Sequence, residues 1–389
     1  MSQAQAVLSE VIAAFDFGAD PVYAQPFGCG HVNDTFLIQI KTENDLRPGF
    51  VLQRLSPEAF KHPRELMQNV IGISEYLCHR IQENGGDCSR EAMEFIRPRS
   101  GNLYYQDSTG CAWRAYRYIG NVRCYQSANT PEQFAASGRA FGRFQRMLES
   151  YPAQTLFETI PRFHDTEDRL AKLKAAIKAD KFGRASECEN EIAFALARDA
   201  DCSVAMQALR DGVLPLRVTH NDTKLNNVLF DEKTGEAVCV IDLDTVMPGL
   251  SIFDFGDSIR FGANHCAEDE KDLSKMAIDL AMYEAYAAAF VEGAGGALTQ
   301  AEIEYLPWGA KLMTLECGIR FLTDYLSGDT YFHTSRPGQN LDRCRTQFKL
   351  VADMEAHWDE HLYFQLVIRR MRATSNWFFI IRKQDRLRW

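Results

Sequence analysis

The chain has 389 residues, enough for two or three domains with a sizeable core, and its 46% hydrophobic and 25% charged content is ordinary for a globular protein. The formal net charge of −10 argues against nucleic acid as a partner, because such binders carry basic surface. Eleven cysteines without a C-x-x-C pair, no signal-peptide pattern and no apolar run of membrane length predict a cytoplasmic small-molecule enzyme without a transmembrane segment.

Residues 1–120 are expected to form a first lobe around an antiparallel sheet. Apolar residues spaced three and four apart predict helices over 4–15 and 63–83. Gly120-Asn121 is expected to be a hinge, and residues 121–365 then form a larger, mostly helical lobe. The first strand of this lobe is predicted to end near residue 40. Four further strands are predicted over 50–55, 92–96, 103–106 and 113–119.

Two features of the first lobe are candidates for nucleotide binding. Gly28 and Gly30 lie in a turn before the first predicted strand, where glycine lets backbone N–H groups approach phosphate, although an ordinary tight hairpin has the same pattern. In strand 50–55, alternation puts Leu52 and Arg54 on one face. Leu52 could cover an adenine. Arg54, with Glu65 as its partner, could supply a cation for nucleotide phosphates at a strand position where kinases carry a lysine; a solvent-exposed arginine is the alternative.

In the second lobe, helices are predicted from Thr130, over 165–210, 268–292 and 299–325, and from 345 to 358. The polar and aromatic stretch 328–343 could line a sugar pocket or simply connect helices. The tail 366–389 holds seven basic residues against one acidic residue. It could be a loosely ordered terminus, or it could bind a membrane surface or a partner.

The stretch 218–244, VTHNDTKLNNVLFDEKTGEAVCVIDLD, carries the chemistry. Asp222 is followed five residues later by Asn227, and Asp242 ends a buried strand twenty residues beyond Asp222. This is the kinase order of a base, a metal-binding amide and a metal-binding carboxylate. Mg²⁺ prefers such oxygen ligands. The pattern H-x-D-x-K-x-x-N followed by D-x-D therefore predicts transfer of a γ-phosphoryl group.

A second acidic motif, Asp254-Phe255-Gly256, has the letters of the kinase metal motif but the wrong spacing, because it lies thirty-two residues after Asp222. Asp257 is expected to lie at the start of a helix and to support the catalytic loop from behind. His220 is also expected to support this loop. Only nine residues separate Asp244 from Asp254, which leaves little room for the activation loop of a protein kinase. Small acceptors are therefore expected, and a catalytically dead nucleotide-binding module is a further alternative.

These motifs resemble the aminoglycoside and choline kinase-like phosphotransferases. Within that group, G-C-G-H-V-N-D-T-F, F-V-L-Q-R-L, T-H-N-D-T-K-L-N-N-V-L-F, D-F-G-D-S-I-R and R-F-L-T-D-Y-L-S-G-D-T-Y-F are most similar to bacterial N-acetylhexosamine 1-kinases. The similarity covers about residues 21–355. It implies an α+β, protein-kinase-like fold of two lobes: a small antiparallel-sheet lobe with one large helix, and a larger helical lobe.

The resemblance also implies roles. ATP is the phosphoryl donor, and Asp222 takes the proton from the anomeric hydroxyl of N-acetylglucosamine or N-acetylgalactosamine. Lys224 faces the transferring phosphate, and Mg²⁺ is held by Asn227 and Asp242, with Asp244 as a further ligand. Other acceptors, such as an aminoglycoside, choline, homoserine or another sugar, remain open, as does the oligomeric state. The implied sugar contacts are His31, Arg320, Asp324 and Arg343.

Overall fold

The computed structural model describes residues 3–18, 21–28, 32–41 and 45–359. The chain forms two compact units that are not continuous in sequence. The first unit comprises Met1–Cys124, Ser150–Pro161 and Asn227–Pro248, and the second comprises the remaining segments. The first break lies close to the predicted hinge, where Asn121 has a left-handed φ of 54°. A division at residue 120 would place Ser150–Pro161 and Asn227–Pro248 in the second lobe, whereas both segments belong to the first unit.

The first unit is built on an antiparallel sheet with the strand order β1-β2-β3-β6-β4, to which β5 is added beside β6. A three-stranded sheet, β10-β9-β7, belongs to the same unit. The elements are α1 (Gln3–Ala14), β1 (Pro21–Pro26), β2 (Asp34–Lys41), β3 (Leu46–Arg54), α2 (Pro63–Glu83), α3 (Cys88–Glu91), β4 (Phe95–Ile96), β5 (Tyr105–Gln106), β6 (Ala112–Arg117), β7 (Val122–Arg123), β9 (Val228–Asp231) and β10 (Ala237–Val240).

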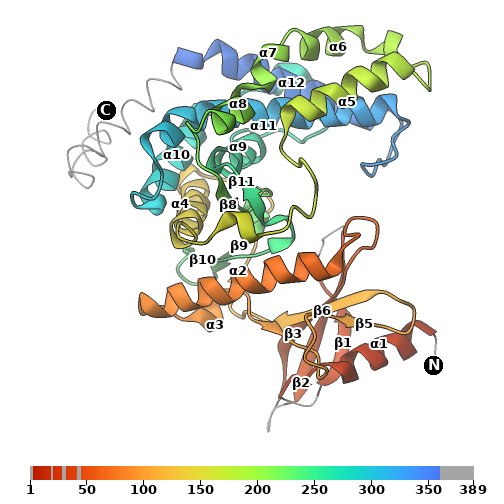
Figure 1. Cartoon of the computed structure of the whole chain (residues 1–389), viewed down its shortest axis with the longest axis vertical. Coiled ribbons are helices and arrows are strands. Elements are labelled where there is room, and N and C mark those ends of the chain that lie inside the picture. Colours follow the sequence, from red (N-terminus) through yellow and green to blue (C-terminus); the bar gives the residue numbers. More distant parts are fainter. Residues whose placement is uncertain (1–2, 19–20, 29–31, 42–44, 360–389) are drawn as a thin grey trace. The chain divides into compact units, whose positions relative to one another are not determined.

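Two helices cover this sheet. The apolar face of α1 packs on alternate residues of the central strands, including Ile38, Leu52 and Ala115, which are fully buried. The long helix α2, orange in Figure 1, has the predicted bounds, and its first position is Pro63, whose fixed φ suits a helix start. Its buried stripe recurs every three to four residues, as an amphipathic helix requires.

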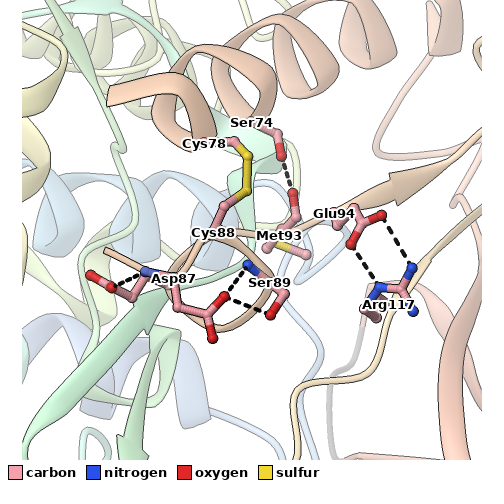
Figure 2. The surroundings of a disulfide bond; sticks show 9 residues. Ser74, Cys78, Asp87, Cys88, Ser89, Met93, Glu94 and Arg117 are labelled. Atoms are coloured by element: carbon pink, nitrogen blue, oxygen red, sulfur yellow. Dashed lines mark hydrogen bonds and ion pairs between the residues drawn. A yellow bond between two sulfur atoms is a disulfide. The ribbon is translucent and has the colours of Figure 1, made fainter. Parts of the chain in front are cut away.

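A disulfide between Cys78 of α2 and Cys88 of α3 holds the short helix against the long one (Figure 2). Asp87 caps α3 by accepting a hydrogen bond from the backbone N–H of Ser89, 3.0 Å away. The helix α3 in turn contacts β10. A disulfide is unusual in the reducing compartment that the cysteine pattern predicted, so the cytoplasmic assignment stays a prediction.

The second unit is mainly helical. Within the described residues of the whole chain, no helix is both long and apolar enough to cross a membrane. The predicted helix 268–292 starts later than expected, because Asp279 caps α10 by accepting a hydrogen bond from the N–H of Met282. The elements are α4 (Pro131–Met147), α5 (Thr166–Ala179), α6 (Glu189–Leu196), α7 (Asp199–Cys202), α8 (Val204–Arg210), β8 (Arg217–Thr219), α9 (Ser251–Gly262), α10 (Leu280–Ala294), α11 (Gln300–Leu326) and α12 (Gln339–Ala356); β11 (Met247–Gly249) lies where the chain re-enters this unit.

Two helix pairs of the second unit approach so closely that glycine is required at the contact. Where α9 crosses α11, a Cβ on Gly256 would collide with the backbone oxygen of Gly309. The same applies where α4 meets α10, at Gly142 and the backbone oxygen of Phe290. Because α9 also carries Asp254 and Asp257, this close packing fixes the helix that lies behind the catalytic loop.

Substituting Gly256→Ala should therefore destabilise the protein by about 1–3 kcal/mol, the usual cost of overpacking, despite the better helix propensity of alanine. The matched control is Gly72→Ala in α2, where the added Cβ would lie 3.0 Å from the hydroxyl of Tyr151, a side chain that can move. Thermal melting of both variants checks this. Equal melting temperatures would contradict the backbone contact.

Candidate active site

The hairpin β9–β10 brings Asn227 and Asp242 together in the first unit. Val228 pairs with Val240 in antiparallel register, and the N–H of Ile241 donates to the backbone oxygen of Asn227 at 2.9 Å. Asn227 immediately precedes one strand and Asp242 follows the other by two residues. An antiparallel hairpin places the start of its first strand beside the end of its second, so the backbones of Asn227 and Asp242 come close although fourteen residues lie between them in the chain.

This pair of side chains fits Mg²⁺. Asp242 is exposed and has a left-handed φ of 60°, a conformation that costs a non-glycine residue about 1–2 kcal/mol and often marks a functional position. Asn227 is buried. The described residues contain no cluster of three or more His, Cys, Asp or Glu side chains arranged for a metal. Mg²⁺ needs none, because it commonly uses one or two protein oxygens together with waters and substrate phosphates.

The second aspartate of the D-x-D motif, Asp244, is occupied by protein partners. Arg114 binds both of its carboxylate oxygens, with Nη2–Oδ2 at 3.0 Å, and the Asn33 amide donates to Oδ2 at 2.8 Å. Both charged side chains are almost fully buried. Burial by itself lowers the pKa of the Arg114 guanidinium, but the charge and hydrogen bonds of Asp244, together with the charges of Tyr116 and Asp242, outweigh burial, and the pKa lies above its usual value. The predicted metal role of Asp244 thus competes with a buried ion pair.

On β3 the face toward Asp244 belongs to Gln53. The Gln53 amide oxygen accepts a hydrogen bond from Nε of Arg114 at 2.9 Å, and the two residues are direct cross-strand partners. Leu52 points the other way, into the cluster against α1. Arg54 is largely exposed and forms an ion pair with Asp34. This differs from the expectation that Leu52 covers an adenine and Arg54 supplies a cation, because the face they share is the one that α1 covers.

Only part of the glycine turn lies within the described residues. Gly28 has a φ of 79°, a left-handed conformation that favours glycine, and it precedes β2. The N–H of Phe27 donates to the backbone oxygen of Thr35 at 2.9 Å, which closes the hairpin around the turn. Gly30 and His31 lie outside the described residues, so their predicted roles remain predictions.

The catalytic loop belongs to the second unit and is held by Asp254. This fully buried carboxylate accepts hydrogen bonds from the backbone N–H groups of His220 (3.0 Å) and Asn221 (2.8 Å) and from the Gln145 amide (2.6 Å). Burial raises the pKa of Asp254. Asp254 thus holds the backbone of the loop, a role that the sequence pattern did not indicate. Asp257 lies in the middle of α9 and not at its start, because the helix already begins at Ser251, and its charge acts on Lys224 of the loop.

His220 is itself buried between the rings of Phe141 and Phe144 of α4, with edge contacts to both. Its Nδ1 accepts a hydrogen bond from the N–H of Asp222 at 3.3 Å. Behind the loop, His164 bridges the backbone oxygen of Asn221 and the buried carboxylate of Glu316. The imidazole ring of His220 is thus packed against two phenylalanine rings, and its hydrogen bond holds the backbone of Asp222.

Asp222 and Lys224 form an ion pair of 2.7 Å and are partly exposed. Burial lowers the pKa of the Lys224 ammonium, but the charges of Asp222 and Asp257 outweigh burial and raise it. Lys224 therefore stays protonated and places a positive charge beside Asp222. Asp257 binds Arg260 through Oδ1, with contacts of 3.0 and 2.8 Å, and its buried Oδ2 has no hydrogen-bond partner among the described residues.

Two of the predicted sugar contacts, Arg320 and Asp324, lie one turn apart near the end of α11. The guanidinium of Arg320 lies over the rings of Phe163, Tyr331 and Phe332, at 5.3, 5.9 and 5.4 Å from their centres. Asp324 accepts hydrogen bonds from the backbone N–H groups of residues 330, 331 and 332, so it shapes the segment that carries the two latter rings. Asp324 is buried and satisfied by these bonds, which suits a structural role.

Arg343 of α12 also contacts this segment, since its Nη1 donates to the backbone oxygen of His333 at 3.1 Å.

A cavity of about 410 Å³ opens in the second unit. Its polar lining includes Arg260, Asn264, Glu268 and Gln347, and the amide oxygen of Gln347 is buried without a hydrogen-bond partner among the described residues. Its volume lies in the range of small-molecule pockets.

The sequence interpretation missed Arg114, Asn33 and Asp254. Arg114 left one signal, a charge in the middle of the otherwise apolar stretch A-W-R-A-Y. A buried charge requires a partner, which would have pointed to an unpaired carboxylate elsewhere. Asn33 left no comparable signal, because asparagine beside a glycine turn is common for local reasons.

The fold and the residue order define the class of protein: a kinase-like α+β enzyme. A family model described as "phosphotransferase enzyme family" matches residues 25–297, most of the chain. The chain belongs to this family and is a phosphotransferase. The predicted α+β fold, with an antiparallel-sheet part and a helical part, is confirmed.

Among solved structures, a microcompartment-associated aminopropanol kinase is similar with a TM-score of 0.54 at 14% identity, covering 92% of this chain and 98% of that one. A choline/ethanolamine kinase family protein from Mesorhizobium loti has a TM-score of 0.51 at 17% identity, covering 95% and 100%. The AMP-bound complex of spectinomycin phosphotransferase has a TM-score of 0.51 at 15% identity, covering 91% and 98%. At these identities the similarity shows the fold alone.

If Asp254 holds the catalytic loop, Asp254→Asn should destabilise the protein by about 2 kcal/mol or more. The new NH₂ group would face N–H donors, and each buried donor left unpaired costs about 1–3 kcal/mol. Urea denaturation measures this. The matched control is Asp272→Asn, an exposed cap that accepts one backbone hydrogen bond at 3.2 Å and should cost under about 1 kcal/mol. Equal losses in the two variants would contradict the role of Asp254.

Proposed function

We propose that this phosphotransferase is an ATP- and Mg²⁺-dependent kinase of a small hydroxylated molecule. The observation that carries the proposal is the backbone hydrogen bond from Ile241 to Asn227 at the open end of the β9–β10 hairpin, which brings the residue directly before Asp242 next to Asn227. Asp222 lies five residues before Asn227 in the chain, which is the kinase order of base and metal ligands. The AMP complex of spectinomycin phosphotransferase, similar in fold, is consistent with a nucleotide as donor.

Asp222 is proposed to accept the proton of the acceptor hydroxyl. Lys224 is ion-paired with this carboxylate and provides positive charge near the transferring phosphate. Asn227 and Asp242 would hold Mg²⁺, which, when bound, neutralises charge on the donor phosphates. Gly28 and Gly30 would let the backbone approach those phosphates. The loop needs little movement for this chemistry, because Asp254 already fixes its backbone.

The acceptor is proposed to be an N-acetylhexosamine, phosphorylated at its anomeric hydroxyl. Aromatic faces next to a guanidinium are a common surface for sugars, and Arg320 with Phe163, Tyr331 and Phe332 provides one. His31 and Arg343 are further proposed contacts. Mono-phosphorylation at this position requires a base beside the anomeric hydroxyl, the role given to Asp222. The resemblance of the sequence motifs to N-acetylhexosamine 1-kinases supports the same acceptor.

Charge distinguishes this acceptor from cationic ones. Arg169 lies beside Arg320: burial, and then the charge of Arg320, lower the pKa of Arg169. Both guanidinium groups contact Phe163, Arg169 through hydrogen bonds to its backbone oxygen. An aminoglycoside or choline would bring positive charge toward two arginines, whose charge the carboxylates of Glu316 and Asp168 offset only in part. A neutral sugar avoids this repulsion, which favours the hexosamine over these alternatives.

Replacing Asp222 by Asn should reduce kcat about 10²- to 10⁴-fold, the usual contribution of a positioned base. ADP binding and the melting temperature should change little, because the side chain is partly exposed. A coupled assay for ADP release measures the rate, and calorimetry measures nucleotide binding. A variant with near-normal turnover would refute the assignment of Asp222 as the base.

The acceptor is tested with a panel of N-acetylglucosamine, N-acetylgalactosamine, choline, ethanolamine and an aminoglycoside, with ADP release as readout and phosphorus NMR of the product. We expect turnover with the two sugars and phosphate on the anomeric oxygen. Arg320→Met should raise KM for the sugar and leave KM for ATP unchanged. Phosphate on the 6-hydroxyl, or turnover confined to the amines, would refute the proposed acceptor.

A further inference from the structure

The buried ion pair of Arg114 and Asp244 lies two residues from the exposed carboxylate of Asp242. Arg114 holds both oxygens of Asp244, and the exposed fractions of the two side chains are 3% and 5%. The short helical turn η4 (Leu243–Thr245) begins directly after Asp242. With Asp244 fixed at two points, the backbone of this turn cannot rotate freely, and the direction of the Asp242 side chain is set.

The left-handed backbone of Asp242 needs such an anchor. At φ 60° and ψ 62° the residue occupies a region that an aspartate leaves readily unless neighbouring contacts hold it. On the other side, the N–H of Ile241 is bound to the backbone of Asn227. Asp242 is therefore held between a strand pairing before it and an ion pair after it.

Asn33 extends the same network to the segment that follows the glycine turn. Its amide NH₂ donates to Asp244 at 2.8 Å, while its amide oxygen accepts from the N–H of Ser56, just beyond β3, at 3.0 Å. One side chain thus connects the start of β2, the end of β3 and the turn after Asp242. A displacement of any of these segments would be transmitted to the other two.

The cation of this network comes from β6 instead of β3. Protein kinases place a lysine on the third strand, where it pairs with a carboxylate and the donor phosphates. Here that strand presents Gln53, and its direct cross-strand partner is Arg114. Gln53 fixes the guanidinium by accepting from its Nε. A planar guanidinium can bind both oxygens of a carboxylate at once, which the ammonium of lysine cannot do.

From these contacts we infer that Arg114 and Asp244 form a positioning pair for the metal site, and that Asp242 is the only carboxylate ligand of the D-x-D motif. Arg114 acts through Asp244 and Asn33 and does not touch the substrates. The inference rests on the proposed function, because it assigns residues around the same Mg²⁺. It replaces the sequence-based assignment of Asp244 as a metal ligand.

A direct metal role for Asp244 makes the opposite prediction. Arg114 would then have to release Asp244 before the metal binds, so weakening the ion pair would leave metal affinity unchanged or increase it. In the positioning arrangement, weakening the pair loosens the turn and lowers metal affinity. Residues that orient metal ligands without touching the metal typically contribute about 10- to 100-fold in affinity.

The test measures Mn²⁺ binding in the presence of ADP by electron paramagnetic resonance, with Mn²⁺ as a probe for Mg²⁺. Arg114→Lys should weaken Mn²⁺ binding about tenfold or more and leave metal-free ADP binding unchanged. The matched control is Arg117→Lys on the same strand, whose partner Glu94 (Figure 2) it also binds through two nitrogens, at 2.6 and 3.2 Å. Arg117→Lys should bind Mn²⁺ like the wild type.

Should Arg114→Lys fail to fold, as a melting curve would show, Asn33→Ala gives the second measurement. It removes one hydrogen bond from Asp244 and keeps the ion pair, and it should weaken Mn²⁺ binding several-fold. Wild-type affinity in either folded variant would overturn the positioning role alone. A wild-type protein that binds no Mn²⁺ with ADP would overturn the proposed function as well.

Discussion

The antiparallel register of β9 and β10 is the constraint on which the candidate site depends. It places Asn227 beside Ile241, the residue before Asp242, without any long-range packing, because the hairpin alone sets the spacing. A slip of one residue would turn both side chains to the opposite face. The register is secured by buried residues on both strands, including Phe230 and Cys239, and by the turn in which Asp231 accepts two backbone hydrogen bonds.

The two halves of the chemistry share one design. In the first unit the exposed Asp242 is accompanied by the buried Asp244. In the second unit the partly exposed Asp222 is accompanied by the buried Asp254. In each pair the buried aspartate fixes the backbone near the exposed one. Buried carboxylates are costly unless they are fully hydrogen-bonded, and both satisfy this requirement. The cost of burial is offset by these bonds, and the backbone next to each acting aspartate is preorganised within its own unit.

Much of this could be predicted from the sequence, because local patterns determine it. The bounds of α2 and the order Asp222, Asn227, Asp242 follow from periodicity and spacing. The role of Arg114 could not be predicted, because it depends on the pairing of β6 with β3. Alternation correctly separated Leu52 from Gln53, but the strand alone does not tell which face α1 covers. Spacing excludes Asp254 as a metal ligand but does not indicate its role in holding the loop backbone, because that role depends on the direction of α9.

The central claim is that the chain transfers phosphate and does not merely bind nucleotide. A single-turnover experiment tests it directly. Enzyme in excess over ATP, with Mg²⁺ present, is mixed with or without N-acetylglucosamine, and the reaction is quenched at intervals. We expect ADP and sugar phosphate in equal amounts within about a second, and little ADP without the sugar. Equal ADP formation in both mixtures, or nucleotide binding without any ADP, would contradict it.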